Sequence, residues 1–142
     1  MAQTRIAVID GQGGGVGKAL VEKIRAAFGK DVNILALGTN SQALNLMLRA
    51  GADDGATGEN PIVKNVSKVH VIMGAIGILA ADAMLGELTP AMAAAIGASD
   101  ALKILIPLNR CQLRVAGLKS IPFAGFIDEA VAMLRDHVQN EV

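Results

Sequence analysis

The sequence predicts one α/β domain, spanning residues 1–142, with a doubly wound and mostly parallel sheet between helices on both faces. Two observations predict this fold class. Short apolar runs alternate with segments of helical periodicity along the whole chain, as in parallel sheets that are buried on both sides. In addition, the 142 residues are 52% hydrophobic and only 18% charged, which supplies enough apolar surface for one large core.

Two strand and helix units open the chain. Residues 5–10 form a nearly continuous apolar run, which is typical of a buried parallel strand, and residues 16–28 carry apolar side chains at helical spacing. Residues 32–37 repeat the strand pattern. Ser41 is the expected N-cap of a second helix, which runs to Ala50 and ends before a glycine.

Shorter units follow in the middle of the chain. A short strand is expected within residues 51–58, and residues 59–61 open a short helix because proline is favoured in a first turn. The apolar run 69–74 is the next predicted strand, and residues 78–85 are expected to be helical. Thr89-Pro90 then forms an N-cap and first-turn pair for a helix that continues through residue 98.

The chain closes with a strand over residues 103–107, a shorter strand over residues 114–118 and an amphipathic helix. Apolar residues recur at helical spacing along this last helix and form its inner stripe. They are Phe123, Ile127, Ala130, Val131, Leu134 and Val138.

Composition and charge exclude several function classes. The 13 basic and 13 acidic residues cancel, so we expect no nucleic-acid partner, and no uncharged apolar run reaches the roughly 18–20 residues of a membrane span. The first residues do not resemble a signal peptide, so we expect a cytoplasmic protein without a membrane partner. One cysteine, Cys111, and two separated histidines, His70 and His137, predict neither an internal disulfide nor a metal site.

Self-association is expected from an excess of small apolar residues. Few charged side chains occur between Lys68 and Lys103, and residues 44–48 leave the second helix apolar almost all round. One small domain cannot bury all of this surface. We therefore predict a homo-oligomer, most simply a two-fold dimer, with these helices in the interface.

A glycine loop between the first strand and the first helix is the candidate ligand site. Glycine lets a backbone approach a ligand closely, and the first N–H groups of the helix point at the same place, which favours an anion such as phosphate. A lysine in the first helical turn opposes the helix dipole, so a bound anion would compensate its charge. The loop residues are Gly11, Gly13, Gly14, Gly15, Gly17 and Lys18.

The spacing of these glycines fits a nucleotide cofactor loop in part. Gly11, Gly15 and Gly17 match a Gly-x-x-x-Gly-x-Gly pattern and resemble the loop of short-chain dehydrogenases/reductases. The chain contains no tyrosine, however, so it lacks the acid of that mechanism. The loop pattern therefore predicts nucleotide binding, and the sequence identifies no reaction.

Two alternatives remain open. The segment from Gly13 to Lys18 resembles the deviant phosphate loop of MinD/ParA-type ATPases, which implies a nucleotide hydrolase that uses Lys18 and Asp10 with Mg²⁺. Ala19 stands against it, because that position lacks the hydroxyl that would hold the cation. In the other alternative the loop only packs the helix on the sheet, and the protein is a non-catalytic oligomeric scaffold.

Other polar residues follow the predicted strands and face the same crevice. The acid that binds ribose in NAD sites, about 20 residues beyond the loop, is missing, which disfavours NAD. Thr39, Asn40 and Ser41 are able to hydrogen-bond the 2′-phosphate of NADP, although a turn and a helix cap also explain them. Asn109 and Arg110 follow the strand at residues 103–107, where a guanidinium suits a phosphate or a carboxylate.

Segments spread along the chain carry a family resemblance. They comprise residues 6–18, 36–40, 51–53, 56–60 and 106–111. Together they resemble an uncharacterised family of short bacterial proteins catalogued as a domain of unknown function. The resemblance implies a Rossmann-like fold and no assigned activity.

Overall fold

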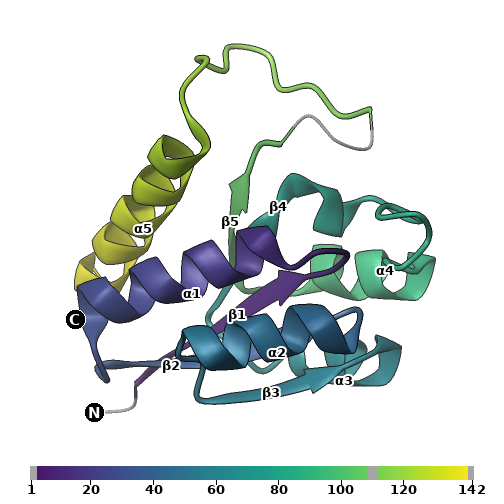
Figure 1. The fold of residues 1–142 in the computed structure, drawn as a ribbon, viewed down its shortest axis with the longest axis horizontal. Helices are drawn as coiled ribbons and strands as arrows, with labels where there is room; N and C mark the ends of the chain where they lie inside the picture. Colours follow the sequence, from purple (N-terminus) through teal and green to yellow (C-terminus); the bar gives the residue numbers. More distant parts are fainter. Residues whose placement is uncertain (1–2, 109–111, 141–142) are drawn as a thin grey trace.

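One five-stranded parallel sheet with helices on both faces forms the core of the computed structural model, which describes residues 3–108 and 112–140 (Figure 1). Its strands are β1 (Thr4–Asp10), β2 (Val32–Gly38), β3 (Asp54–Thr57), β4 (Val71–Ala75) and β5 (Leu102–Ile106). Its helices are α1 (Gly15–Phe28), α2 (Ser41–Ala50), α3 (Glu59–Asn65), the 3-10 helix η1 (Ile76–Leu79), α4 (Pro90–Ala98) and α5 (Phe123–Asn140). The predicted doubly wound α/β fold is confirmed.

The strand order β3-β2-β1-β4-β5 places β1 at the centre of the sheet. From β1 the chain adds β2 and β3 on one side, and it then crosses over to add β4 and β5 on the other. Val8 accordingly lies between Ala36 of β2 and Met73 of β4. The direction of winding reverses between β1 and β4, and ligands of such sheets bind at this reversal, beyond the carboxyl ends of the strands.

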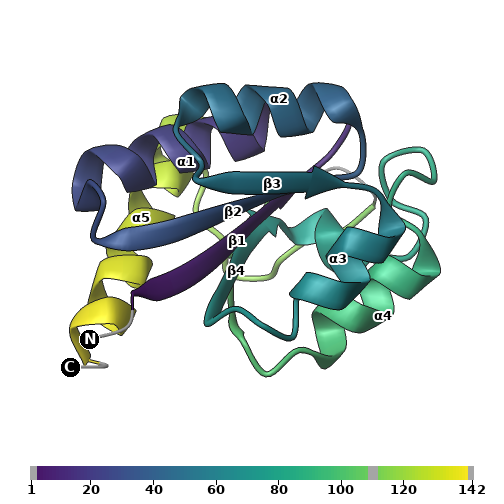
Figure 2. The same ribbon diagram turned by 90° about the horizontal axis from the view of Figure 1, so that it is seen from below.

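The core has two layers because β1 is buried on both faces. Ile6 and Val8 face the layer built with α1 and α5, whereas Ala7 and Ile9 face the layer built with α3 and α4, and all four are fully buried. Figure 2 shows α1 and α2 above the sheet and α3 and α4 below it. Within the described residues, no helix is both long enough and apolar enough to cross a membrane.

The helix predicted over residues 78–85 is wrong. Only η1 is helical there, and the chain continues in turns with positive φ at Asp82, Met84 and Leu85. The N–H of Asp82 donates to the carbonyl of Leu88 at 2.8 Å, which folds the segment back on itself. Alanine and leucine favour a helix locally, but Glu87, two residues beyond the predicted helix, makes hydrogen bonds to Gln12 and Thr39 that compete with a continuous helix.

The strand predicted over residues 114–118 is also wrong. Residues 112–122 lie outside the sheet and arch away from the body before the chain continues as α5 (Figure 1). Gly117 adopts a φ of 80°, which turns the chain, and Val115 and Leu118 remain exposed. An apolar run forms a strand only where a neighbouring strand accepts its hydrogen bonds, and β5 pairs with β4 alone among the described residues.

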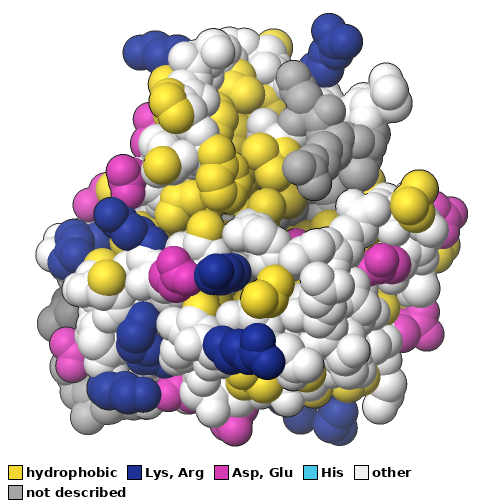
Figure 3. Space-filling view, in the orientation of Figure 1, with side chains coloured by type: hydrophobic (Ala, Val, Ile, Leu, Met, Phe, Trp, Pro, Cys, Tyr) yellow, Lys and Arg dark blue, Asp and Glu magenta, His cyan; other side chains and the backbone are white. Residues whose placement is uncertain are grey.

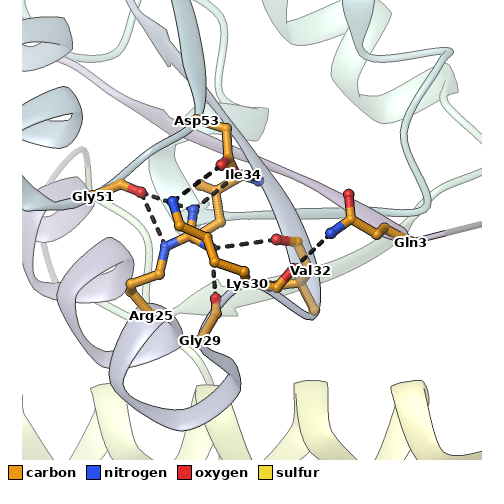
Figure 4. A network of polar contacts seen from close by, with 8 residues as sticks. All are labelled: Gln3, Arg25, Gly29, Lys30, Val32, Ile34, Gly51 and Asp53. Carbon is orange, nitrogen blue, oxygen red and sulfur yellow. Dashed lines mark hydrogen bonds and ion pairs between the residues drawn. The ribbon is translucent and has the colours of Figure 1, made fainter.

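A polar network closes the opposite, amino edge of the sheet (Figure 4). The guanidinium of Arg25 donates to the carbonyls of Gly29 and Gly51, at the ends of α1 and α2, and to the carboxylate of Asp53 at 2.7 Å. Asp53 also accepts from the N–H of Ile34 in β2 at 2.8 Å. One arginine therefore ties the ends of two helices to β2 and to Asp53, the residue before β3.

Replacing Arg25 with alanine is expected to lower the free energy of unfolding by roughly 2–3 kcal/mol at neutral pH, because the partly buried carbonyls of Gly51 and Val32 and the carboxylate of Asp53 lose a charged donor. Denaturation in urea measures this change in the free energy of unfolding. The matched control is Lys23→Ala, whose exposed ion pair with Asp128 (2.9 Å) is expected to contribute less than about 1 kcal/mol. Equal losses in both variants would contradict this role for Arg25.

The same network predicts a pH dependence. Burial raises the pKa of Asp53, but the N–H of Ile34 and the charges of Arg25 and Lys30 outweigh it and hold the pKa below its ordinary value of 3.8. A lowered folded-state pKa stabilises the protein fully above the unfolded-state pKa, and this contribution is lost as the pH falls through the folded-state pKa. Below about pH 4, stability should therefore fall less steeply in Arg25→Ala than in the unmodified protein.

Candidate functional site

A cavity of about 590 Å³ opens at the carboxyl edge of the sheet, where the winding reverses between β1 and β4. One wall is the glycine loop, residues 11–16, and another is the segment after β4, with Ala75 and Gly77. In Figure 3 hydrophobic side chains gather in the hollow between the start of α5 and the body of the protein. The apolar lining of the cavity comes from Val16, Met84, Leu108 and Phe123.

Three of the loop glycines are required by the packing of the protein itself. A Cβ on Gly11 would overlap the hydroxyl of Thr39, and a Cβ on Gly17 would lie 2.9 Å from the Cβ of Asp10. Gly14 has a φ of 76°, which disfavours other residues, and a Cβ there would lie 2.9 Å from the Cα of Ala43. These positions explain how α1 approaches both β1 and α2 so closely.

The other two loop glycines, Gly13 and Gly15, are not explained by packing. A Cβ on either one would meet no atom within 4 Å, and neither has a positive φ. Both line the cavity. Within the described chain, the N–H groups of Gly13, Gly15 and Val16 donate no hydrogen bond, since these groups precede the first full turn of α1. The cavity is therefore bordered by three unused backbone donors next to backbone without side chains.

The carboxylate of Asp10 anchors the loop. It is 4% exposed, and its Oδ1 accepts from the N–H of Gly11 at 2.8 Å while its Oδ2 accepts from the N–H of Gly17 at 2.6 Å. The negative charge thus lies at the positive end of the α1 dipole, where it is favourable. In the hydrolase alternative Asp10 acts with Mg²⁺, whereas in the structure both of its oxygens accept hydrogen bonds from the protein's own backbone.

Lys18 lies one helical turn into α1, outside the lining of the cavity. Its ammonium is 3.9 Å from the carboxylate of Glu22, and both side chains are about half exposed. Such an exposed pair contributes little to stability, so it does not fix the lysine in one place. The ammonium can approach an anion on the loop without losing an important contact.

The carboxylate of Glu87, which is distant from β2 in the sequence, lies at the carboxyl end of β2. Oε1 of Glu87 accepts from the N–H of Gln12 at 2.9 Å, from the hydroxyl of Thr39 at 2.7 Å and from the amide of Asn40 at 2.9 Å. The N–H of Gln12 and the hydroxyl of Thr39 outweigh burial and hold the pKa of the Glu87 carboxyl below its usual range. Sequence reasoning missed Glu87, because nothing local marks a residue that acts 48 positions away from Thr39.

The residues predicted after β2 lie beside the loop, but they have structural partners. Asn40 donates to the carbonyl of Gln12 at 3.1 Å, and its Oδ1 accepts from the N–H of Ala43 at 2.8 Å. Asn40 is therefore the N-cap of α2, and the expectation that Ser41 takes this place is wrong; Ser41 is the first helical residue and is exposed. The cap falls one residue earlier because Asn40 reaches both the loop and the helix.

The predicted residues Asn109 and Arg110, and the single cysteine Cys111, lie outside the described residues. Of the remaining predicted side chains, Thr39 and Asn40 are brought to the loop. His70 lies at the opposite edge of the sheet, where its Nδ1 accepts from the N–H of Arg5 at 2.8 Å. No group of three or more His, Cys, Asp or Glu in the described chain is arranged to hold a metal ion.

Comparison with protein families identifies a match. The family model described as a domain of unknown function (DUF3842) covers residues 5–139, which is nearly the whole chain. No curated protein matches the sequence.

Proposed function

The chain belongs to the DUF3842 family, a domain of unknown function, and we propose its function from the site: it binds a nucleotide or another phosphorylated ligand in the cavity between β1 and β4. The phosphate would accept hydrogen bonds from the N–H groups of Gly13, Gly15 and Val16. The observation that carries the proposal is the open space beside Gly13 and Gly15, because the protein itself needs no glycine at either position. A ligand in contact with the backbone would need both.

The chemistry of the cavity suits such a ligand. Unpaired N–H groups at a helix N-terminus attract an anion through their hydrogen bonds and through the helix dipole. The apolar side chains of Met84, Leu108 and Phe123 border the same cavity and offer contact area to a planar base or another apolar body. Lys18 adds a positive charge nearby.

The hydrolase alternative receives less support from the geometry. In a hydrolase Asp10 would bind a cation or its water ligands, but each oxygen of its carboxylate already accepts a backbone N–H. No observation at the loop favours hydrolysis over binding alone. Ligand binding is therefore the function that we propose.

A thermal-shift screen of the full chain tests this proposal. The panel contains nucleotides, dinucleotides, sugar phosphates and acyl-CoA, each with and without Mg²⁺. A ligand that binds only the folded protein is expected to raise the melting temperature, by an amount that grows with its concentration over the dissociation constant. The shift should shrink in Lys18→Ala, and a shift that required Mg²⁺ would favour the hydrolase. No shift with any compound would refute the proposal.

We also propose that the protein is a homodimer. Ala91, Ala94 and Gly97 are exposed on α4, within the stretch of few charged residues between Lys68 and Lys103. Leu85, in the turns before α4, is 95% exposed. An isolated exposed leucine is ordinary, but a leucine next to an uncharged helix face supports an interface.

Size-exclusion chromatography with light scattering tests the dimer. At micromolar concentration the protein is expected to have about twice its monomer mass of 14.6 kDa. Leu85→Asp should shift it toward the monomer. Met133→Asp, at a residue of α5 that is 56% exposed, is the control and should leave the mass unchanged. A monomer at all concentrations would contradict the dimer.

A further inference from the structure

The end of β2 carries an acid, although no acid occurs in the sequence around it. Glu87 reaches this place from the turns that follow η1, and its Oε1 bonds to Thr39 and Asn40, which directly follow β2. In doubly wound sheets that bind dinucleotides, a carboxylate at the end of this strand accepts a hydrogen bond from the 2′-hydroxyl of the ribose. Here a distant part of the chain supplies the same group.

Glu87 lies directly against the glycine loop. The N–H of Gln12, within the loop, donates to its Oε1, and a Cβ on Gly11 would lie 3.1 Å from that atom. Gly11 and Gln12 both line the cavity, and Glu87 lies next to them just outside the lining. A ligand whose phosphate lies on Gly13 and Gly15 and whose sugar extends across Gly11 and Gln12 would meet Glu87.

The second oxygen of this carboxylate is available for such a contact. All three hydrogen bonds go to Oε1, and within the described chain Oε2 accepts none. Glu87 is only partly buried. The donors around it also keep it ionised at neutral pH, since they lower its pKa.

We infer that Glu87 selects the sugar of the ligand: it accepts a hydrogen bond from a free ribose 2′-hydroxyl and excludes a 2′-phosphate. This inference rests on the proposed binding of a nucleotide at the loop. A phosphate placed at the same point would face an ionised carboxylate, and Thr39 and Asn40, the groups able to stabilise it, already donate to Glu87. The ligand class is thus a ribonucleotide without a 2′-phosphate, and NADP is disfavoured.

Three probes that differ only at the 2′ position test the inference by isothermal titration calorimetry on the full chain. They are 5′-AMP, 2′-deoxy-5′-AMP and adenosine 2′,5′-bisphosphate. We expect the unmodified protein to bind 5′-AMP at least about tenfold more tightly than the bisphosphate, because like charges oppose each other there. Loss of the 2′-hydroxyl should weaken binding by about three- to tenfold.

Glu87→Gln removes the charge and keeps an acceptor oxygen for Gln12, so the preference over the bisphosphate should fall to less than about threefold. Glu59→Gln is the matched control. Glu59, at the start of α3, accepts a hydrogen bond from Thr89, the N-cap of α4, so this substitution should leave the preference for 5′-AMP unchanged. A bisphosphate that binds the unmodified protein as tightly as 5′-AMP would overturn the inference and leave the proposed function intact. If none of the three probes binds while other phosphorylated compounds do, the inference fails alone; if nothing phosphorylated binds, both fail. The comparison of probes on the unmodified protein does not depend on the folding of any variant.

Discussion

Gly15→Ala is expected to abolish ligand binding without weakening the fold. Gly15 is the first residue of α1, has no positive φ, and an added Cβ would meet nothing within 4 Å. Alanine should therefore stabilise the free protein by about 0.4–1 kcal/mol, because it restricts the unfolded chain more than glycine does. The new methyl group would occupy the space beside the N–H groups that we assign to phosphate. We expect affinity to fall by about 100-fold or more, equivalent to ~2.7 kcal/mol.

Gly17→Ala is the matched control for this variant. Gly17 lies two residues further along the same helix, but its Cβ would lie 2.7 Å from the sulfur of Met47 and 2.9 Å from the Cβ of Asp10. This variant should lose about 1–3 kcal/mol of stability through overpacking. Melting curves measure stability, and titration with the best compound of the screen measures affinity. If Gly15→Ala binds that compound as well as the unmodified protein does, the loop is not its site.

This contrast shows what the sequence could not distinguish. The placement of five glycines after a strand and at the start of a helix predicted the turn between β1 and α1, because that order of elements is visible in the periodicity. The letters alone do not separate Gly17, which packs against β1, from Gly15, which faces open space. Only the positions of Met47 and Asp10 in three dimensions assign one glycine to packing and the other to the cavity.

The order of strands and helices followed from sequence because the central strands β1 and β4 are buried on both faces and the amphipathic helices on one. The errors occur where tertiary contacts outweigh local preference. Residues 78–85 have a helical composition, but Glu87, two residues beyond them, bonds to Gln12 and Thr39, and the chain before it turns with positive φ. For the same reason, the acid at the end of β2 could not be predicted: Glu87 reaches Thr39 across 48 positions of the sequence. A single sequence contains no signal that pairs positions 39 and 87.

Asp10→Ala is expected to cause the largest loss of stability among single substitutions at the site. The buried carboxylate accepts from the N–H groups of Gly11 and Gly17, so alanine would leave two buried donors without a partner. Each such donor costs about 1–3 kcal/mol, and we expect a total loss of roughly 2–4 kcal/mol in urea denaturation. The loss of stability in Asp10→Asn should be smaller than in Asp10→Ala, because the amide keeps one acceptor oxygen but turns an N–H toward the other donor.

The control for Asp10 is Asp128→Ala, which removes an exposed carboxylate paired with Lys23 and should change stability by less than about 1 kcal/mol. The same measurement separates the two roles considered for Asp10. If the carboxylate served to bind a cation, it would destabilise the ligand-free protein. Asp10→Asn would then leave the stability of the ligand-free protein unchanged or raise it. A carboxylate that shapes the loop stabilises the empty protein, so the same substitution must weaken it. The short hydrogen bonds from Gly11 and Gly17 lead us to expect the second result, with reduced ligand affinity as its consequence because the loop donors lose their fixed direction.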